Sequence, residues 1–269
     1  MRLRNPGSVA QVITTLQSLL YECENCRNGQ DALQARDAYL RWVEKADAQY
    51  GSLFTHSALE DGLHSPGYWE IHRLRFDSPR PFPMIHREIR VQCDRIERVS
   101  ADLQRLREFI ERPGDLVVPD TSALVQGEYF EDFDWAGELG LSGPVRLIIP
   151  VAVLEELDQL KDRERGRAQK RARSVVRRLR ELARKVPPGA PVPVRKGVTF
   201  EVLWEDGDHV RLAITDVEIT EQALLLHELT GREVLLACAD ATMEFRARQA
   251  GLTVYDMPVP VPAEDRPTG

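Results

Sequence analysis

Apolar positions in the first 113 residues recur at the spacing of amphipathic helices. Residues 9–23 place apolar side chains three, four and seven positions apart, residues 33–46 carry a second such pattern, and residues 96–110 alternate spacings of three and four. The last pattern is typical of helices that pair along a seam. Residues 51–83, which contain Gly, Ser and Pro, predict a long irregular connection. We therefore expect an all-helical region, a hairpin or a bundle, that ends at Pro113.

The pattern changes after Asp115, where short apolar runs alternate with helical periodicity. Strands are predicted at residues 116–119, 146–150, 233–237 and 252–255, and helices at 151–157, 172–183, 219–229 and 241–250. Residues 198–204 and 209–214 predict a hairpin around the turn pair Asp206-Gly207. Short apolar strands separated by helices predict the α/β class, with a parallel sheet covered on both faces.

These patterns divide the chain into three segments. We expect a helical N-terminal region of unknown role at residues 1–113, an α/β domain at 114–257, and a disordered tail rich in Pro and charge at 258–269. The 269 residues, 42% of them hydrophobic, suffice for one or two domains with a core. No apolar run approaches the ~20 residues of a membrane span. The chain start lacks the apolar core of a signal peptide, and four cysteines make no disulfide framework. We expect a cytoplasmic protein with no membrane contact.

Two apolar runs each end in an acidic residue that begins a new helical pattern. The run 117–119 leads to Asp120, and the run 234–239 leads to Asp240. Open α/β sheets place their ligand crevice at the carboxyl ends of strands, so these two acids are expected to converge. Glu156 lies in the helix after the second strand, and Asp216 directly precedes another helical pattern. Because like charges in a cleft raise one another's pKa, the group predicts a bound hard cation such as Mg²⁺ or Mn²⁺.

Four motifs together resemble the PIN-domain nuclease family, over roughly residues 115–257. They are, in chain order, Val-Pro-Asp-Thr-Ser at 118–122, Pro-Val-Ala-Val-Leu-Glu-Glu-Leu-Asp at 150–158, Asp-Val-Glu-Ile at 216–219 and Cys-Ala-Asp at 238–240. Their order and spacing are specific as a set. The resemblance implies a PIN-like parallel sheet flanked by helices, and metal-dependent endonucleolytic cleavage of single-stranded or structured RNA.

The resemblance also assigns roles to individual residues. The implied catalytic residues and metal ligands, for one or two Mg²⁺ or Mn²⁺ ions, are Asp120, Glu156, Asp216 and Asp240. In this arrangement metal ions lower the pKa of water, orient its attack on phosphorus and stabilise the leaving oxygen, so no protein nucleophile is required. Thr121 and Ser122 are expected to cap a helix start and to hold Asp120 in place.

Three positions near these motifs leave alternatives. Glu155 competes with Glu156 as the helix carboxylate, and Glu156 is chosen because it precedes Leu157 as the family pattern requires. Cys238 departs from the usual Thr or Ser; a thiol is a weaker hydrogen-bond donor, which implies poorer support for Asp240 and lower activity. Glu218 is interpreted as a first-turn acid favoured by the helix dipole.

A strongly basic segment contrasts with the net charge of −7 of the whole chain. Residues 161–185 carry twelve Lys and Arg against three acids, a net charge of +9. This run is either a solvated helix face or a surface that contacts RNA phosphates without reading sequence. On the second interpretation, the expected RNA-binding residues are Lys170, Arg173 and Arg177.

The leading hypothesis is a Mg²⁺- or Mn²⁺-dependent ribonuclease that hydrolyses RNA phosphodiester bonds. The alternative is a catalytically weak or inactive PIN-like module that binds RNA or a protein partner. An aspartyl phosphatase also begins with an acid after a strand, but Ser122 stands where that class has its second Asp. Cys23-Glu24-Asn25-Cys26 is interpreted as a pair of incidental cysteines, because a zinc site needs two further ligands. The pattern leaves open whether the N-terminal helices form a homodimer or bind another protein.

Overall fold

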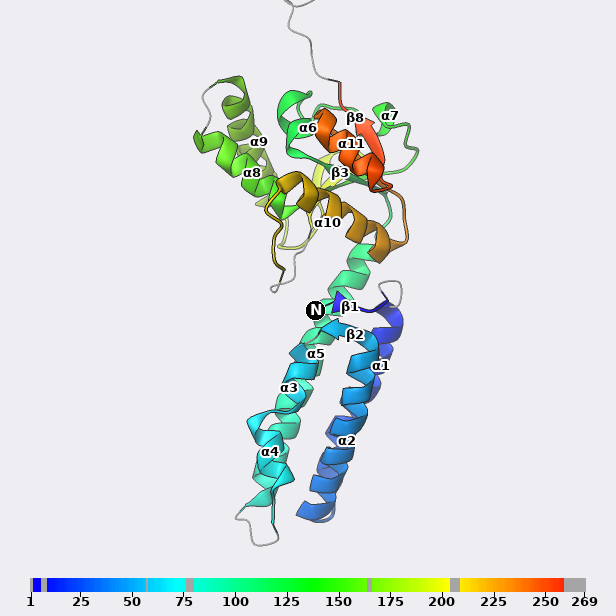
Figure 1. The fold of residues 1–269 in the computed structure, drawn as a ribbon, viewed down its shortest axis with the longest axis vertical. Helices are drawn as coiled ribbons and strands as arrows, with labels where there is room; N and C mark the ends of the chain where they lie inside the picture. The colour runs from blue at the N-terminus through cyan, green and yellow to red at the C-terminus, as the bar shows by residue number, and fades with distance from the viewer. Residues whose placement is uncertain are drawn as a thin grey trace, which may run out of the picture. The chain divides into compact units, whose positions relative to one another are not determined.

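The computed structural model describes residues 2–5, 9–56, 58–75, 80–163, 166–203 and 209–258. The chain divides into two compact units, Met1–Arg112 and Pro113–Gly269 (Figure 1). Among the described residues, none of the helices combines the length and the apolar character needed to cross a membrane. Residues 259–269, nearly all of the tail expected to be disordered, lie outside the described residues.

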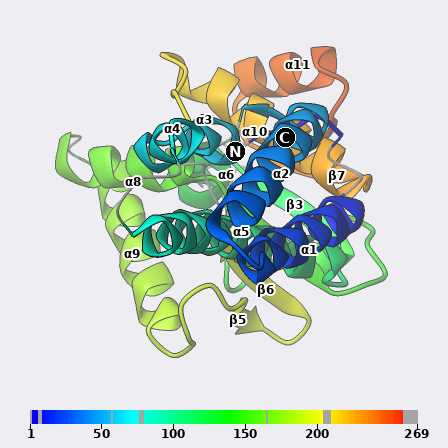
Figure 2. The same ribbon diagram turned by 90° about the horizontal axis from the view of Figure 1, so that it is seen from below.

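The N-terminal unit consists mainly of helices. Its elements are β1 (Arg2–Leu3), α1 (Val9–Asn25), the 3₁₀ helix η2 (Cys26–Asn28), α2 (Ala32–Leu53), β2 (Phe54–His56), α3 (Ala58–Leu63), α4 (Pro66–His72) and α5 (Pro81–Glu111). Helices α1, α2 and α5 pack against one another, as Figure 2 shows nearly end-on. Their inward faces bury Leu16, Tyr39 and Ile89 completely. The expected helical region is confirmed, with a short antiparallel ribbon of β1 and β2 added to it.

The prediction of a long irregular connection at 51–83 was wrong for most of that stretch, which holds α3 and α4. The sequence has the residues that start helix α4. The Ser65 hydroxyl caps the helix by accepting a hydrogen bond of 3.0 Å from the Tyr68 backbone N–H, and Pro66 occupies the first turn. Leu63 and Ile71 are fully buried in the core of the unit. Burial of these side chains stabilises helices that are too short to be stable from helix propensity alone.

The C-terminal unit is built on a sheet whose described strands run in the order β5-β6-β4-β3-β7-β8. The strands are β3 (Asp115–Pro119), β4 (Val145–Ile149), β5 (Val192–Arg195), β6 (Val198–Val202), β7 (Val234–Cys238) and β8 (Thr253–Asp256). All neighbouring pairs are parallel except β5 and β6. Val117, Leu147 and Leu236 are completely buried on the central strands. The expected α/β class is confirmed, with one antiparallel edge strand added.

Helices flank this sheet. They are α6 (Thr121–Gln126), α7 (Trp135–Glu138), α8 (Val151–Arg163), α9 (Arg167–Ala183), α10 (Thr215–Thr230) and α11 (Ala241–Gln249). Helices α8 and α9 lie side by side in Figures 1 and 2, and α10 packs on α8, β7 and α11. The apolar stripe of α9, which includes Val175 and Leu179, is buried as its spacing predicts.

The predicted hairpin of residues 198–204 and 209–214 was wrong. Strand β6 instead pairs with β4 on one side and β5 on the other, so it has no free edge for residues 209–214. The β5–β6 turn uses Gly197 with a φ of +77°, a conformation that glycine adopts without strain. Val210 is 85% exposed and belongs to no strand. The turn pair at residues 206–207 lies outside the described residues.

Candidate active site

Asp120 stands at the carboxyl end of β3, in the centre of the sheet. Its backbone N–H donates a hydrogen bond of 2.9 Å to the Ala237 carbonyl of the neighbouring strand β7. Its side chain caps α6 by accepting a 2.7 Å bond from the Ala123 N–H, and the Ser122 hydroxyl donates to the same carboxylate at 2.8 Å. Asp120 is only 6% exposed. The carboxylate is therefore buried and fixed in orientation.

Burial raises the pKa of the Asp120 carboxyl to about 7. The hydrogen bonds from Ala123 and Ser122 oppose this shift, because they stabilise the ionised form. The negative charges of Glu156 and Asp216 raise the pKa further. The structure thus places Glu156 and Asp216 within electrostatic reach of Asp120.

Glu156 is joined directly to the segment that carries Asp120. The Thr121 hydroxyl donates a hydrogen bond of 2.5 Å to the Glu156 carboxylate, which is half-buried on α8. The adjacent Glu155 is exposed and forms an ion pair with Arg211. The two neighbouring acids therefore have different surroundings, and it is Glu156 that lies beside the start of α6.

Asp216 lies in the first turn of α10 and is half-buried. One carboxylate oxygen lies 3.7 Å from a guanidinium nitrogen of Arg246 on α11. This is a loose ion pair, so the Asp216 charge is only partly compensated. Its negative charge contributes to the raised pKa of the Asp120 carboxyl, which relates Asp216 to the predicted site.

Asp240 follows β7, the strand next to β3, but its side chain is exposed. The carboxylate caps α11 by accepting a 3.0 Å bond from the Met243 N–H. Its link to Asp120 passes through Ser122, whose hydroxyl accepts a 2.7 Å bond from the Ala239 N–H while donating to Asp120. The structure therefore places Asp240 at the same edge of the sheet, without a direct contact to the other three acids.

Cys238, the residue that departs from the family pattern, is fully buried at the end of β7. Burial raises the pKa of its thiol to about 12, and the charge of Asp120 adds to this effect. The thiol is therefore neutral at physiological pH.

The carboxylate oxygens of these acidic side chains are the kind of ligand that a divalent cation such as Mg²⁺ or Mn²⁺ prefers. Asp120 and Glu156 have no ion-pair partner among the described Lys, Arg and His residues, so a cation would relieve their mutual repulsion. Within the described ranges, no three His, Cys, Asp or Glu side chains are gathered closely enough to hold a metal ion by themselves. Mg²⁺ usually retains several waters and uses one or two carboxylates with substrate phosphate oxygens, which is compatible with this arrangement.

Glu218 has a role that the sequence analysis missed. It is 2% exposed, and its carboxylate accepts hydrogen bonds from the Leu212 N–H at 3.0 Å and from Gln222, and it pairs with the His209 ring at 2.6 Å. These bonds attach residues 209–212 to α10, the helix that carries Asp216. No signal in the sequence separates this buried acid from a solvated first-turn acid.

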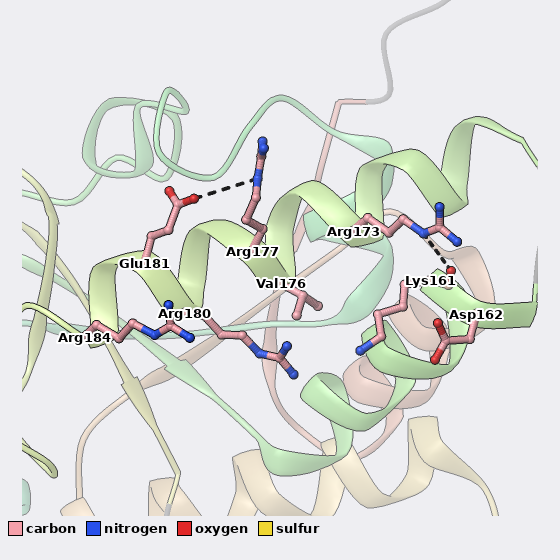
Figure 3. Close-up of a pocket in the computed structure, with 8 residues that line it drawn as sticks. All are labelled: Lys161, Asp162, Arg173, Val176, Arg177, Arg180, Glu181 and Arg184. Atoms are coloured by element: carbon pink, nitrogen blue, oxygen red, sulfur yellow. Dashed lines mark hydrogen bonds and ion pairs between the residues drawn. The ribbon is translucent and has the colours of Figure 1, made fainter.

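The three predicted RNA-binding residues on α9 have different surroundings. Lys170 is exposed, and Arg173 donates a 3.0 Å bond to the Lys161 carbonyl of α8. Arg177 is exposed and lies 4.0 Å from Glu181. Arg173 and Arg177 line a pocket of about 510 Å³, which Lys170 does not line (Figure 3). Arg180 and Arg184, which were not among the predicted RNA-binding residues, line the same pocket. They follow Arg173 by seven and eleven residues, a spacing that indicates one face of a helix.

A comparison with curated proteins finds no match to the chain. The PIN domain family matches residues 117–258, which begin inside β3 and include all four predicted carboxylates. Since the match spans just over half of the 269 residues, the chain belongs to the PIN-domain family, whose members are generally nucleases.

Proposed function

We propose that the protein is a metal-dependent endoribonuclease that hydrolyses RNA phosphodiester bonds at the site around Asp120. The observation that carries this proposal is the burial of the Asp120 carboxylate at the end of β3, with Glu156 and Asp216 close enough to repel it. Carboxylates without cationic partners are costly to bury, and they are retained where they bind a cation. Membership of the PIN-domain family supports the nuclease class.

Asp120 and Glu156 would hold the metal, Mg²⁺ or Mn²⁺ as one or two ions, and Asp216 and Asp240 would complete the site from neighbouring elements. When bound, the metal would lower the pKa of water and stabilise the charge that develops on phosphate oxygens. The protein contributes orientation. Ser122 and Ala123 fix the Asp120 carboxylate, and Thr121 fixes that of Glu156. Such supporting hydrogen bonds keep ligands in place before the metal arrives.

The direct test is the substitution Asp120→Asn in the full chain. Asn retains the size of the side chain and an oxygen that can cap α6, but it lacks the charge. We expect loss of Mn²⁺-stimulated cleavage of a single-stranded RNA with an unchanged circular dichroism spectrum. The matched control is Asp31→Asn, which neutralises another helix-capping carboxylate, at the start of α2 in the N-terminal unit. Equal cleavage by Asp120→Asn and the wild type would refute the proposal.

The second candidate is a PIN-like module that binds RNA or a protein without cutting RNA. Cys238 favours it, because a buried neutral thiol replaces the hydroxyl common in the family. Thermal unfolding in a Mn²⁺ series separates the two candidates. A functional site stabilises the fold as the metal concentration rises, whereas a degenerate site leaves the melting temperature unchanged.

A further inference from the structure

The pocket between α8 and α9 is strongly basic. We call it the basic pocket. Figure 3 shows the residues that line it, which are Lys161, Asp162, Arg173, Val176, Arg177, Arg180, Glu181 and Arg184. Five of these side chains are cationic and two are acidic. Arg180 from α9 and Lys161 from α8 point toward one another, with Val176 between them (Figure 3). A volume of about 510 Å³ is large enough for part of a nucleotide chain.

The cations of the basic pocket form a row along one helix. The four arginines of α9, which follow one another at spacings of four, three and four residues, are Arg173, Arg177, Arg180 and Arg184. At 1.5 Å per residue the row is about 16 Å long. One nucleic-acid strand in a duplex carries a phosphate about every 3.4 Å along its axis, so a row of this length can contact several phosphates. A single terminal phosphate would need only one or two of these side chains.

The ion pairs of Arg177 and Arg180 in the basic pocket are loose. Arg177 is 74% exposed in its side chain and lies 4.0 Å from Glu181, and Arg180 lies 3.7 Å from Asp158. Arg184 has no ion-pair partner among the described residues. Exposed pairs at these distances contribute little stability, and each guanidinium keeps further N–H donors. The arginines are therefore available to bind an anionic ligand.

Helix α8 contributes residues to both the basic pocket and the candidate active site. Helix α8 carries Glu156 near its start and Lys161 five residues later, a rise of about 7.5 Å. Asp158, between these two, lies 2.6 Å from Lys161 and 3.7 Å from Arg180. One helix thus carries both a carboxylate of the candidate active site and a cation of the basic pocket.

We propose that the basic pocket binds backbone phosphates of the RNA strand, away from the bond that is cleaved. The inference rests on the proposed function for the identity of the ligand as RNA. Contacts to phosphates supply affinity and orientation without reading sequence. The pocket therefore makes binding depend on the length of the strand and on salt, and not on a phosphate at the 5′ end.

The experiment measures binding without cleavage. The full chain is titrated in EDTA against a fluorescent, unstructured 20-nucleotide RNA, and the dissociation constant is measured at several salt concentrations. The test variant is the double substitution Arg177→Gln and Arg184→Gln. The matched control is Arg167→Gln and Lys185→Gln, which removes the same charge from exposed residues near the ends of α9 that do not line the basic pocket. Arg173 is left intact because it bonds to α8.

We expect the test variant to bind RNA at least about tenfold more weakly, which is about 1.4 kcal/mol. The slope of log K against log salt should become shallower by about 1.4, because each contact to a single strand contributes about 0.7. The control variant should keep both the affinity and the slope to within a factor of about two. RNAs with a 5′-hydroxyl and a 5′-monophosphate should respond equally.

Two results would overturn the inference. One is an equal loss of affinity in the test and control variants, which would assign binding to general charge. The other is a loss confined to 5′-phosphorylated RNA, which would assign the basic pocket to strand ends. Because the titration is performed in EDTA, its outcome is independent of the cleavage test with Asp120→Asn. A basic pocket that binds RNA in a protein that does not cut it would refute only the proposed function.

Discussion

The Thr121 hydroxyl donates a 2.5 Å hydrogen bond to the Glu156 carboxylate, across the packing of α6 against α8. Thr121 is 5% exposed and directly follows Asp120, the cap of α6. One short segment therefore fixes two carboxylates: Ser122 and Ala123 bind that of Asp120, and Thr121 binds that of Glu156. This arrangement separates the positioning of the two acids, so that each can be tested alone.

The substitution Thr121→Val tests the positioning of Glu156. Valine has nearly the same shape as threonine, so the fold should be retained while the bond to Glu156 is lost. Removing a hydrogen bond that supports a metal ligand typically costs about 10–100-fold in metal affinity or activity. We expect a loss of this size, measured as a higher Mn²⁺ concentration for half-maximal RNA cleavage.

The control is Thr14→Val on α1, whose hydroxyl bonds to the Ala10 carbonyl of its own helix. This variant removes the same group far from the candidate site in the sequence and in the other unit. A Thr121→Val protein with the wild-type Mn²⁺ dependence would show that the bond has no role in metal binding.

The raised pKa of Asp120 predicts how stability depends on pH without metal. The carboxyl has a pKa of about 7 in the folded protein against an ordinary value of 3.8. Between these values the folded state binds more protons than the unfolded state, so its contribution to the free energy of unfolding falls as pH rises from about 4 to about 7. Above that window the cost approaches roughly 4 kcal/mol.

Asp120→Asn cannot ionise, so it should escape this cost. In EDTA at pH 8 we expect the variant to melt at a higher temperature than the wild type, with the difference vanishing near pH 4. Mn²⁺ at pH 8 should stabilise the wild type, by about 2.7 kcal/mol at a hundredfold excess over the dissociation constant, but not the variant. A difference in melting temperature between the variant and the wild type that stays constant from pH 4 to pH 8 would contradict the raised pKa of Asp120.

The sequence was sufficient for the elements that are apolar and regular. Val117 and Leu236 lie in short apolar runs, and a parallel sheet places the residues after such runs at one edge, which is where Asp120 and Asp240 are found. The closeness of Glu156 to this edge followed from the family pattern and not from periodicity. Its bond to Thr121 could not be foreseen, because it depends on how α8 packs against α6.

Two errors have physical causes that a single sequence does not carry. Residues 209–214 alternate like a strand, yet β6 is already paired on both edges, and pairing partners are a property of the whole sheet. Glu218 resembles any first-turn acid, and its burial is determined by the chain segment at His209 and Leu212 that folds over it. Tertiary contacts decided both cases.

Replacing Cys238 by serine should improve the candidate site. Cys238 is fully buried at the end of β7, two residues before Asp240. A hydroxyl forms stronger hydrogen bonds than a thiol, so Cys238→Ser should hold Asp240 more firmly. We expect half-maximal cleavage at a several-fold lower Mn²⁺ concentration. Cys26→Ser, at a buried cysteine of the N-terminal unit, is the control. An unchanged Mn²⁺ requirement would show that Cys238 does not affect metal binding at the candidate site.

A buried ion pair joins β4 and β6 in the sheet that carries the candidate site. The Arg146 guanidinium donates to both carboxylate oxygens of Glu201, at 2.7 and 3.1 Å, with side chains 2% and 5% exposed. Glu201→Gln leaves the guanidinium buried without its counter-charge, which should lower the free energy of unfolding by about 3–5 kcal/mol.

The double substitution Arg146→Met and Glu201→Leu removes both charges and should cost much less, because apolar side chains need no desolvation. Urea denaturation of the wild type, Arg146→Met, Glu201→Leu and the double variant measures the coupling. Additive losses would show that the two residues act independently, whereas strong non-additivity is expected for a pair buried this completely.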